Sequence, residues 1–172
     1  MLYNHSRILM IYKILKINAL ILFLSFFATA EPEQGKDYEL IPSDLIEGQS
    51  VTEIFGYWCN TCFSFESTVD SLKEQRPNVN VVQIPAGNEV YARLFYTIKA
   101  LNLGKEAHLN VYKDIQLLRK NLSSKSDVEE FAKRHNYNQA EFMNVYNSFG
   151  IGIKAKNALR KVRELGNAEI GR

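Results

Sequence analysis

Hydrophobic residues follow two different periods in the first half of the chain. A nearly continuous apolar run over residues 51–58 predicts a strand buried on both faces. From Cys59 onward, apolar residues recur every three or four positions, which predicts one face of a helix that Pro77 ends. Residues 78–85 predict a second long strand, parallel to the first under the right-handed crossover rule, and residues 38–41 predict a short separate strand. The pattern therefore indicates a strand, a sharp turn, a helix and a parallel strand.

The second half of the chain keeps to the helical period. Apolar residues within 90–101 and again within 111–118 predict two helices, which Gly104 separates. Residues 154–165 predict a last helix with a basic, solvated face. Two further helix starts are predicted by residue pairs that match a capping signal, Ser126 with Glu129 and Asn138 with Glu141.

The first 30 residues have the three parts of a secretory signal peptide. Three basic residues precede an uncharged, mostly apolar stretch over 17–30, and Ala30 is followed by Glu31. The stretch is shorter than the roughly 20 residues that span a bilayer, so we expect cleavage after Ala30, with an uncleaved membrane anchor as the alternative. Either Met1 or Met10 can be the start without changing the exported chain, which begins at Glu31.

Composition narrows the class of protein. The chain has 172 residues, of which 46% are hydrophobic and 23% charged, as in an ordinary globular domain with room for an insertion. Net charge is +2, and outside the first 30 residues it is about −1, which gives no reason to expect a nucleic-acid partner. The two cysteines are too few for a disulfide framework. A zinc site with His108 and His135 is an alternative, but we interpret these histidines as exposed helix residues and expect no metal.

The two cysteines, Cys59 and Cys62, lie where the strand becomes a helix. At a helix N-terminus the free backbone amides and the helix dipole stabilise a thiolate, so Cys59 is the candidate nucleophile. Cys62 is one turn deeper on the apolar face and is the candidate resolving thiol. Tyr57 and Trp58, just before the turn, are candidates for an apolar rim that holds an unfolded chain, or else they cap the core.

Two carboxylates occupy positions that do not suit a charge. Glu66 lies one helical turn after Cys62, and Glu53 interrupts the apolar strand that leads to Cys59. Burial raises the pKa of a carboxyl group, which makes both residues candidates for exchanging a proton with Cys62. The alternative is that both side chains reach solvent.

The segment Glu53-Ile-Phe-Gly-Tyr-Trp-Cys59-Asn-Thr-Cys62-Phe-Ser-Phe-Glu66 resembles the active-site segment of the DsbA family of periplasmic thiol:disulfide oxidoreductases. The resemblance implies an α/β, thioredoxin-like fold with an inserted helical domain. Residues 31–86 would form the N-terminal part of the thioredoxin-like domain, residues 87–150 the insertion, and residues 151–172 a helix that returns toward the first part.

The same resemblance implies the activity and the partners. The protein would introduce disulfides into exported proteins in the periplasm, with Cys59 as the nucleophile and Cys62 as the resolving cysteine. Its partners would be unfolded exported proteins with free cysteines and a DsbB-type, quinone-linked membrane oxidase. No cofactor is implied beyond the Cys59–Cys62 disulfide itself, and neither metal nor nucleic acid is expected.

Two departures from the family pattern change the expectations. Asn60-Thr61 replaces the common Pro-His pair between the cysteines, so we expect a higher Cys59 pKa and a less oxidising disulfide than in the strongest members. None of the four prolines matches the cis-proline that faces the motif, and the C-terminal strands and final helix are missing. The chain is therefore interpreted as truncated, which leaves a non-catalytic remnant or peptide-binding module as one alternative and a reductase or isomerase as another.

Overall fold

The computed structural model describes residues 31–38, 40 and 50–170, so the expected signal peptide lies outside the described residues. Residues 1–40 form a unit separate from residues 41–172. In the first unit, Gln34 and Tyr38 form an isolated bridge, and Leu40 has no regular structure. The strand expected over residues 38–41 is therefore not seen at its described positions, while residues 39 and 41 lie outside them. All elements below belong to the second unit.

A strand, a helix and a parallel strand open the second unit, as the sequence predicts. Strand β1 (Ser50–Phe55) leads into helix α2 (Asn60–Gln75), and strand β2 (Asn80–Pro85) returns beside β1 in parallel. The register runs from Ser50 opposite Asn80 to Phe55 opposite Pro85.

The prediction that this first strand is buried on both faces is wrong. Strand β1 ends at Phe55, three residues before Trp58, and within the described residues it pairs with β2 alone. Phe55 is buried, but Val51 and Ile54 are 43% and 39% exposed. Phe55, at the end of the strand, is the one fully buried residue of β1, and it packs into the hydrophobic core.

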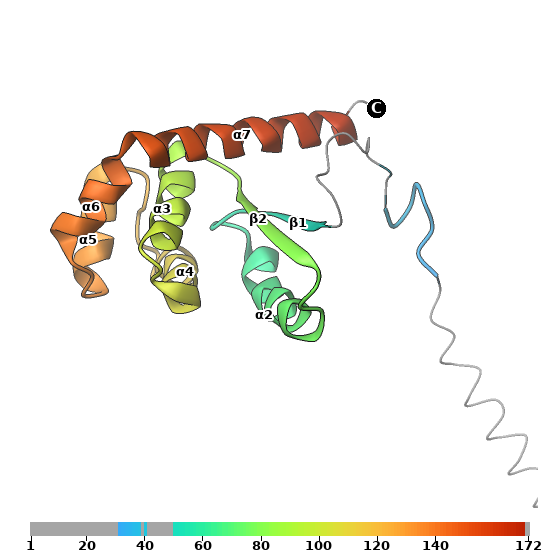
Figure 1. The fold of residues 1–172 in the computed structure, drawn as a ribbon, viewed down its shortest axis with the longest axis horizontal. Helices are drawn as coiled ribbons and strands as arrows, with labels where there is room; N and C mark the ends of the chain where they lie inside the picture. The colour runs from blue at the N-terminus through green and yellow to red at the C-terminus, as the bar shows by residue number, and fades with distance from the viewer. Residues whose placement is uncertain (1–30, 39, 41–49, 171–172) are drawn as a thin grey trace, which may run out of the picture. The chain divides into compact units, whose positions relative to one another are not determined.

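Helices make up the rest of the second unit. After β2 come α3 (Glu89–Ala100), α4 (Gly104–Tyr112), the π-helix η3 (Lys113–Leu117), α5 (Lys125–Arg134), α6 (Gln139–Asn147) and α7 (Phe149–Ile170). Figure 1 shows α7 as a long helix that runs across α3 and continues past β2, and it also contacts α6. No helix of the described residues has the length and apolarity needed to cross a bilayer.

Helix ends differ from the sequence predictions in three places. The helix expected within 111–118 begins already at Gly104 as α4 and continues through η3 to Leu117. Helix α5 is capped by Ser124 with Asp127, two residues before the predicted pair, because these two residues exchange side-chain and backbone hydrogen bonds. Helix α7 begins at Phe149, five residues earlier than predicted, and the Ser148 hydroxyl accepts a hydrogen bond from the Ile151 N–H at its start. The predicted cap at Asn138 is confirmed, since its side chain accepts from the Glu141 N–H.

The main hydrophobic core joins the end of β1 to the helical part. Phe55 and Tyr57, each 1% exposed, pack into it beside buried residues of α3, α4 and the later helices. Phe55 makes edge contacts with Tyr57 and with Phe95 of α3, at centroid distances of 5.2 and 5.1 Å. The turn that carries the cysteines is therefore anchored in the same core as the helices.

Candidate active site

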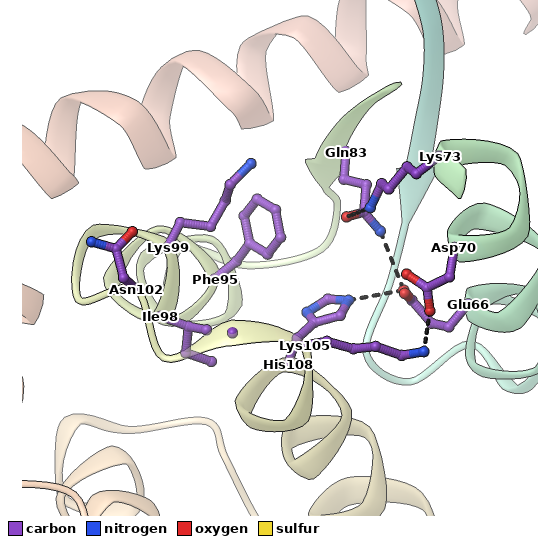
Figure 2. Close-up of a pocket in the computed structure, with 11 residues that line it drawn as sticks. Glu66, Asp70, Lys73, Gln83, Phe95, Ile98, Lys99, Asn102, Lys105 and His108 are labelled. Atoms are coloured by element: carbon purple, nitrogen blue, oxygen red, sulfur yellow. Dashed lines mark hydrogen bonds and ion pairs between the residues drawn. The ribbon is translucent and has the colours of Figure 1, made fainter. Parts of the chain in front are cut away.

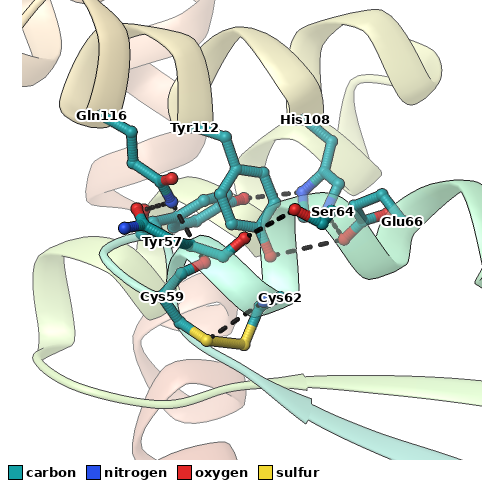
Figure 3. The surroundings of a disulfide bond; sticks show 9 residues. Tyr57, Cys59, Cys62, Ser64, Glu66, His108, Tyr112 and Gln116 are labelled. Atoms are coloured by element: carbon teal, nitrogen blue, oxygen red, sulfur yellow. Dashed lines mark hydrogen bonds and ion pairs between the residues drawn. A yellow bond between two sulfur atoms is a disulfide. The ribbon is translucent and has the colours of Figure 1, made fainter.

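Cys59 and Cys62 form a disulfide at the start of α2 (Figure 3). A tight turn precedes the helix, in which the Cys59 N–H donates to the Gly56 carbonyl over 2.9 Å. Cys59 is the N-cap, and its Sγ accepts a hydrogen bond from the Cys62 N–H at 3.1 Å. The first sulfur thus takes the place of the side-chain oxygen of an ordinary N-cap and lies where free amides stabilise a negative charge. Cys62 packs against the core cluster. The placement predicted for both cysteines is confirmed.

The two aromatic residues before the turn have different surroundings. Tyr57 is buried in the core, so its assignment to an exposed rim is wrong and the alternative that it caps the core holds; its ring contacts Phe55 of β1 and Tyr112 of α4. Trp58 is 50% exposed and stacks on Tyr91 of α3 at 5.9 Å. A side chain at Gly56 would collide with this indole ring, since a Cβ there would lie 2.6 Å from it. Trp58 alone remains the candidate for the rim.

A buried hydrogen-bonded chain connects the turn to α2 through α4. The Tyr57 hydroxyl pairs with His108 Nδ1 at 2.9 Å, and His108 Nε2 pairs with Glu66 Oε1 at 2.8 Å. Tyr112 donates its hydroxyl to the same carboxylate oxygen at 3.4 Å. Glu66 is 4% exposed, so its carboxylate is buried and has polar partners. Burial raises the pKa of Tyr57 well above its usual value, with further contributions from Tyr112 and the negative charge of Glu66, which keeps this hydroxyl protonated.

Gln83 of β2 bridges the two candidate carboxylates. Its Nε2 donates to Glu53 Oε2 at 2.9 Å and to Glu66 Oε1 at 3.4 Å. Burial raises the pKa of Glu53; the hydrogen bond from Gln83 opposes this shift, and the charge of Glu66 adds to it. Glu53 and Glu66 therefore belong to one network, although they come from a strand and a helix.

Two depressions lie on either side of this network. An apolar groove of about 390 Å³ runs between β1 and α2 and ends at the disulfide; its lining includes Glu53, Cys59, Cys62, Phe65 and Val69. A polar pocket of about 350 Å³ opens between α2, β2, α3 and α4 (Figure 2). Glu66 and His108 line the pocket, so the buried network has one boundary at the cysteine groove and the other at the polar pocket.

Replacing Glu53 with glutamine is expected to stabilise the protein at neutral pH. Because the pKa of Glu53 is raised in the folded state, ionising this group costs free energy, and the cost applies at pH values above its folded pKa. Below about pH 4.5, the ordinary pKa of a glutamate, Glu53 is protonated in both the folded and the unfolded protein. The stability gained by Glu53→Gln should therefore vanish there. Urea unfolding at pH 7 and at pH 4 measures this difference. The matched control is Glu74→Gln, at an exposed position of α2; an equal gain in both variants at pH 7 would contradict the assignment.

Sequence reasoning missed four residues of the site. The sequence predicts an exposed His108, which is buried, and its pattern does not indicate Gln83, Tyr112 or Gln116 as site residues. The spacing of four makes His108 and Tyr112 neighbours on a helix surface, and likewise Tyr112 and Gln116, and that is the available signal. Because His108 and Gln116 are polar, the hydrophobic pattern does not indicate that this face packs inward.

The histidines of the zinc alternative have carboxylate and hydroxyl partners. His108 is engaged by Tyr57 and Glu66, while His135 pairs with Asp114 at 3.1 Å and is only 18% exposed at its side chain, so it too is not an exposed residue. Asp114 is fully buried and also accepts two hydrogen bonds from Arg134. In the described ranges, 31–38, 40 and 50–170, no cluster of three metal-ligating side chains occurs.

Comparison with known proteins places this geometry in a family. No protein-family model matches the chain. The curated thiol:disulfide interchange protein DsbA of Pseudomonas syringae pv. tomato is 32% identical over 146 residues, which cover 79% of this chain and 66% of that protein. The chain belongs to the DsbA family. DsbA of Pseudomonas aeruginosa is 28% identical over 143 residues, again with 66% of the relative covered. The chain thus spans just under two thirds of the length of these two DsbA proteins.

Solved DsbA structures share the fold. The crystal structure of Pseudomonas aeruginosa DsbA matches with a TM-score of 0.59 and 28% identity, covering 64% of this chain and 60% of that one. Reduced DsbA1 from Neisseria meningitidis matches with a TM-score of 0.66, covering 83% and 79%; at 15% identity this shows the fold alone. The predicted α/β, thioredoxin-like fold class is confirmed. The predicted domain boundaries at residues 86 and 150 stay predictions.

Proposed function

We propose that this DsbA-family chain is a thiol:disulfide oxidoreductase that introduces disulfides into exported proteins through Cys59 and Cys62. The observation that carries the proposal is the Cys59–Cys62 disulfide at the N-terminus of α2, with Cys59 as the cap. A sulfur in this position is a good leaving group, because the Cys62 N–H and the helix dipole stabilise its thiolate.

The reaction begins with attack on Cys59. A substrate thiolate attacks Cys59 Sγ and forms a mixed disulfide, while the Cys59–Cys62 bond breaks and Cys62 leaves as a thiolate. A second substrate thiolate then attacks the substrate sulfur of the mixed disulfide and expels Cys59 as a thiolate. The substrate loses two electrons and gains a disulfide, and the cysteine pair is left reduced. A DsbB-type, quinone-linked membrane oxidase would take these two electrons and restore the Cys59–Cys62 bond.

Glu66 and Glu53 are proposed to supply the proton that Cys62 takes up and to accept the proton that it releases. When Cys62 leaves as a thiolate it needs a proton, and when the pair is reoxidised the proton must leave. Glu53 lines the same groove as Cys62, and Gln83 connects it to Glu66 at the polar pocket. Glu53 can therefore exchange a proton at the groove and Glu66 at the polar pocket, while Gln83 orients both carboxyl groups.

The setting of the reaction is the periplasm in this proposal. The sequence of residues 1–30 has the pattern of a cleavable signal peptide, which would deliver a chain that begins at Glu31. Unfolded exported proteins with free cysteines are the proposed substrates, and the exposed Trp58 is the proposed contact beside the sulfur. The redox group is the disulfide itself, with no added cofactor or metal.

The reduction potential of the pair tests the proposed direction of transfer. The full chain is equilibrated in buffers with known ratios of reduced to oxidised glutathione and quenched with an alkylating reagent. Mass spectrometry then gives the fraction of the cysteine pair that is oxidised. We expect a two-electron transition nearer to about −120 mV, the reference value for strongly oxidising DsbA, than to about −270 mV, the value for thioredoxin. Asn60-Thr61 offers no cation to the thiolate, so the value should lie below that of the strongest oxidants.

The same chain in concentrated urea is the control for the potential, because there the two thiols form an ordinary flexible pair. A folded-state value near −270 mV would contradict the proposal and favour a reductase. A folded-state value equal to that of the unfolded chain would mean that the fold does not tune the pair, and would favour the non-catalytic alternative, a peptide-binding module.

A further inference from the structure

One face of the continuous segment α4–η3 contacts the cysteine turn and the start of α2 at three successive levels. His108 pairs with Tyr57 and Glu66, and Tyr112 stacks on Phe63 of α2 with ring centroids 5.1 Å apart. Gln116 is the third residue of this face, and Figure 3 shows it beside the turn. The first two residues hold side chains, whereas Gln116 holds the main chain of the turn.

Gln116 makes two hydrogen bonds with one amide group. Its Nε2 donates to the Tyr57 carbonyl at 2.8 Å and to the Cys59 carbonyl at 3.1 Å. The Cys59 carbonyl also accepts the first hydrogen bond of α2, from the Phe63 N–H at 3.1 Å. The half-buried Gln116 therefore fixes the Tyr57–Trp58 and Cys59–Asn60 peptide groups, and the second of these leads directly from Cys59 into the helix.

The π-helix explains why Gln116 reaches the turn. In an α-helix, residues four apart drift by about 40° around the axis, so a third residue in the series would rotate away from the face of the first. From Lys113 to Leu117 the segment forms the wider π turn, which reduces this drift and keeps Gln116 below Tyr112. Single π turns often occur at functional sites.

We propose that Gln116 is a positioning residue for disulfide exchange, holding Cys59 in its N-cap position when the Cys59–Cys62 bond is open. This inference rests on the proposed function and names a residue outside the cysteine motif on which it depends. In the oxidised protein, the covalent bond to Cys62 already restrains the Cys59 side chain. In the reduced protein that restraint is gone, and the two bonds from Gln116 keep the Cys59 main chain oriented so that its sulfur faces the Cys62 N–H.

The effect of Gln116 on the reduction potential has a predicted direction. Gln116 stabilises the reduced form more than the oxidised form, and a DsbA is a strong oxidant because its reduced form is stabilised. Removing the amide should therefore make the disulfide less oxidising and raise the pKa of the Cys59 thiol. A residue that only supports the fold would stabilise both forms equally and leave the potential unchanged.

The test compares Gln116→Met with Leu117→Met in the full chain. Methionine keeps the length of glutamine but has no N–H donor, and Leu117 is the next residue of the same π turn, 65% exposed. We expect Gln116→Met to shift the equilibrium with glutathione about tenfold toward the disulfide, equivalent to about 30 mV, and Leu117→Met to shift it less than twofold. The thiolate absorbance of Cys59, followed against pH, should move to higher pH in Gln116→Met alone. A shift below twofold in folded Gln116→Met, or equal shifts in both variants, would overturn the proposal.

Gln116→Glu keeps the proposal testable if Gln116→Met does not fold. The introduced carboxyl group donates one hydrogen bond when protonated and none when ionised. The reduction potential of the cysteine pair in Gln116→Glu should therefore differ more from that of the unchanged chain at pH 7 than at pH 4.5. A difference that does not depend on pH would overturn the proposal. These measurements follow the cysteine pair alone. A chain that transfers no disulfide to substrates would refute the proposed function, while the dependence of the pair on Gln116 would still be measured.

Discussion

Replacing Cys59 with serine is expected to abolish disulfide exchange, whereas replacing Cys62 with serine should stop the exchange halfway. The reason is the different placement of the two sulfurs. Cys59 caps α2, where its thiolate is stabilised, and Cys62 packs against the core and serves to resolve the mixed disulfide. Without Cys62, the mixed disulfide at Cys59 has no neighbouring thiol to break it.

The measurement is the mass of the protein after mixing each reduced variant with a peptide that carries one disulfide. Cys62→Ser should form a stable one-to-one adduct through Cys59, with one peptide thiol released for each adduct. Cys59→Ser should form adducts at least about a hundredfold more slowly, since its remaining thiol lacks the activated position. Adducts that form at equal rates in both variants would show that the helix terminus does not distinguish the cysteines.

Replacing His108 with alanine is expected to cost roughly 3–5 kcal/mol of unfolding free energy, because leaving a buried polar group without its partner costs about 1–3 kcal/mol and His108 has two such partners. The imidazole is the shared partner of the Tyr57 hydroxyl and the buried Glu66 carboxylate, and its ring also packs against Phe55 at 5.1 Å. Its removal leaves two polar groups short of a partner and opens a cavity between them.

Urea unfolding of the full chain at pH 7 measures this loss. His135→Ala is the matched control, because His135 is a less buried histidine whose partner Asp114 keeps two hydrogen bonds from Arg134. The unfolding free energy of His135→Ala should fall by about 1 kcal/mol. Tyr57→Phe should cost about the same amount, and much less in the His108→Ala background, since the partner is already gone. Equal losses in the two histidine variants would contradict the role given to His108.

The sequence was informative wherever structure is decided locally. The change of period at Cys59 predicts the strand-to-helix turn, and the side chain of Asn138 caps α6 as expected. Glu66 was singled out because a carboxylate on the apolar face of a helix needs a reason, and the structure buries it. These features depend on residues within one or two turns of one another.

The network around Glu66 could not be predicted in the same way, because its partners lie far away in sequence. His108 is 42 residues from Glu66 and 51 from Tyr57, and neither contact follows from helical spacing. The exposure of Val51 and Ile54 depends on which neighbours β1 has, and an apolar run alone does not contain that information. The π turn that directs Gln116 likewise has no signal in the hydrophobic pattern.

The most direct test of the account is to mix the oxidised full chain with a reduced, unfolded protein that contains two cysteines, in the absence of any other oxidant. We predict that each oxidised chain forms one disulfide in the substrate and that Cys59 and Cys62 become alkylatable in equal amount, as the transfer of two electrons requires. A substrate that stays reduced while the Cys59–Cys62 disulfide remains intact would contradict the assignment of this chain as a disulfide donor.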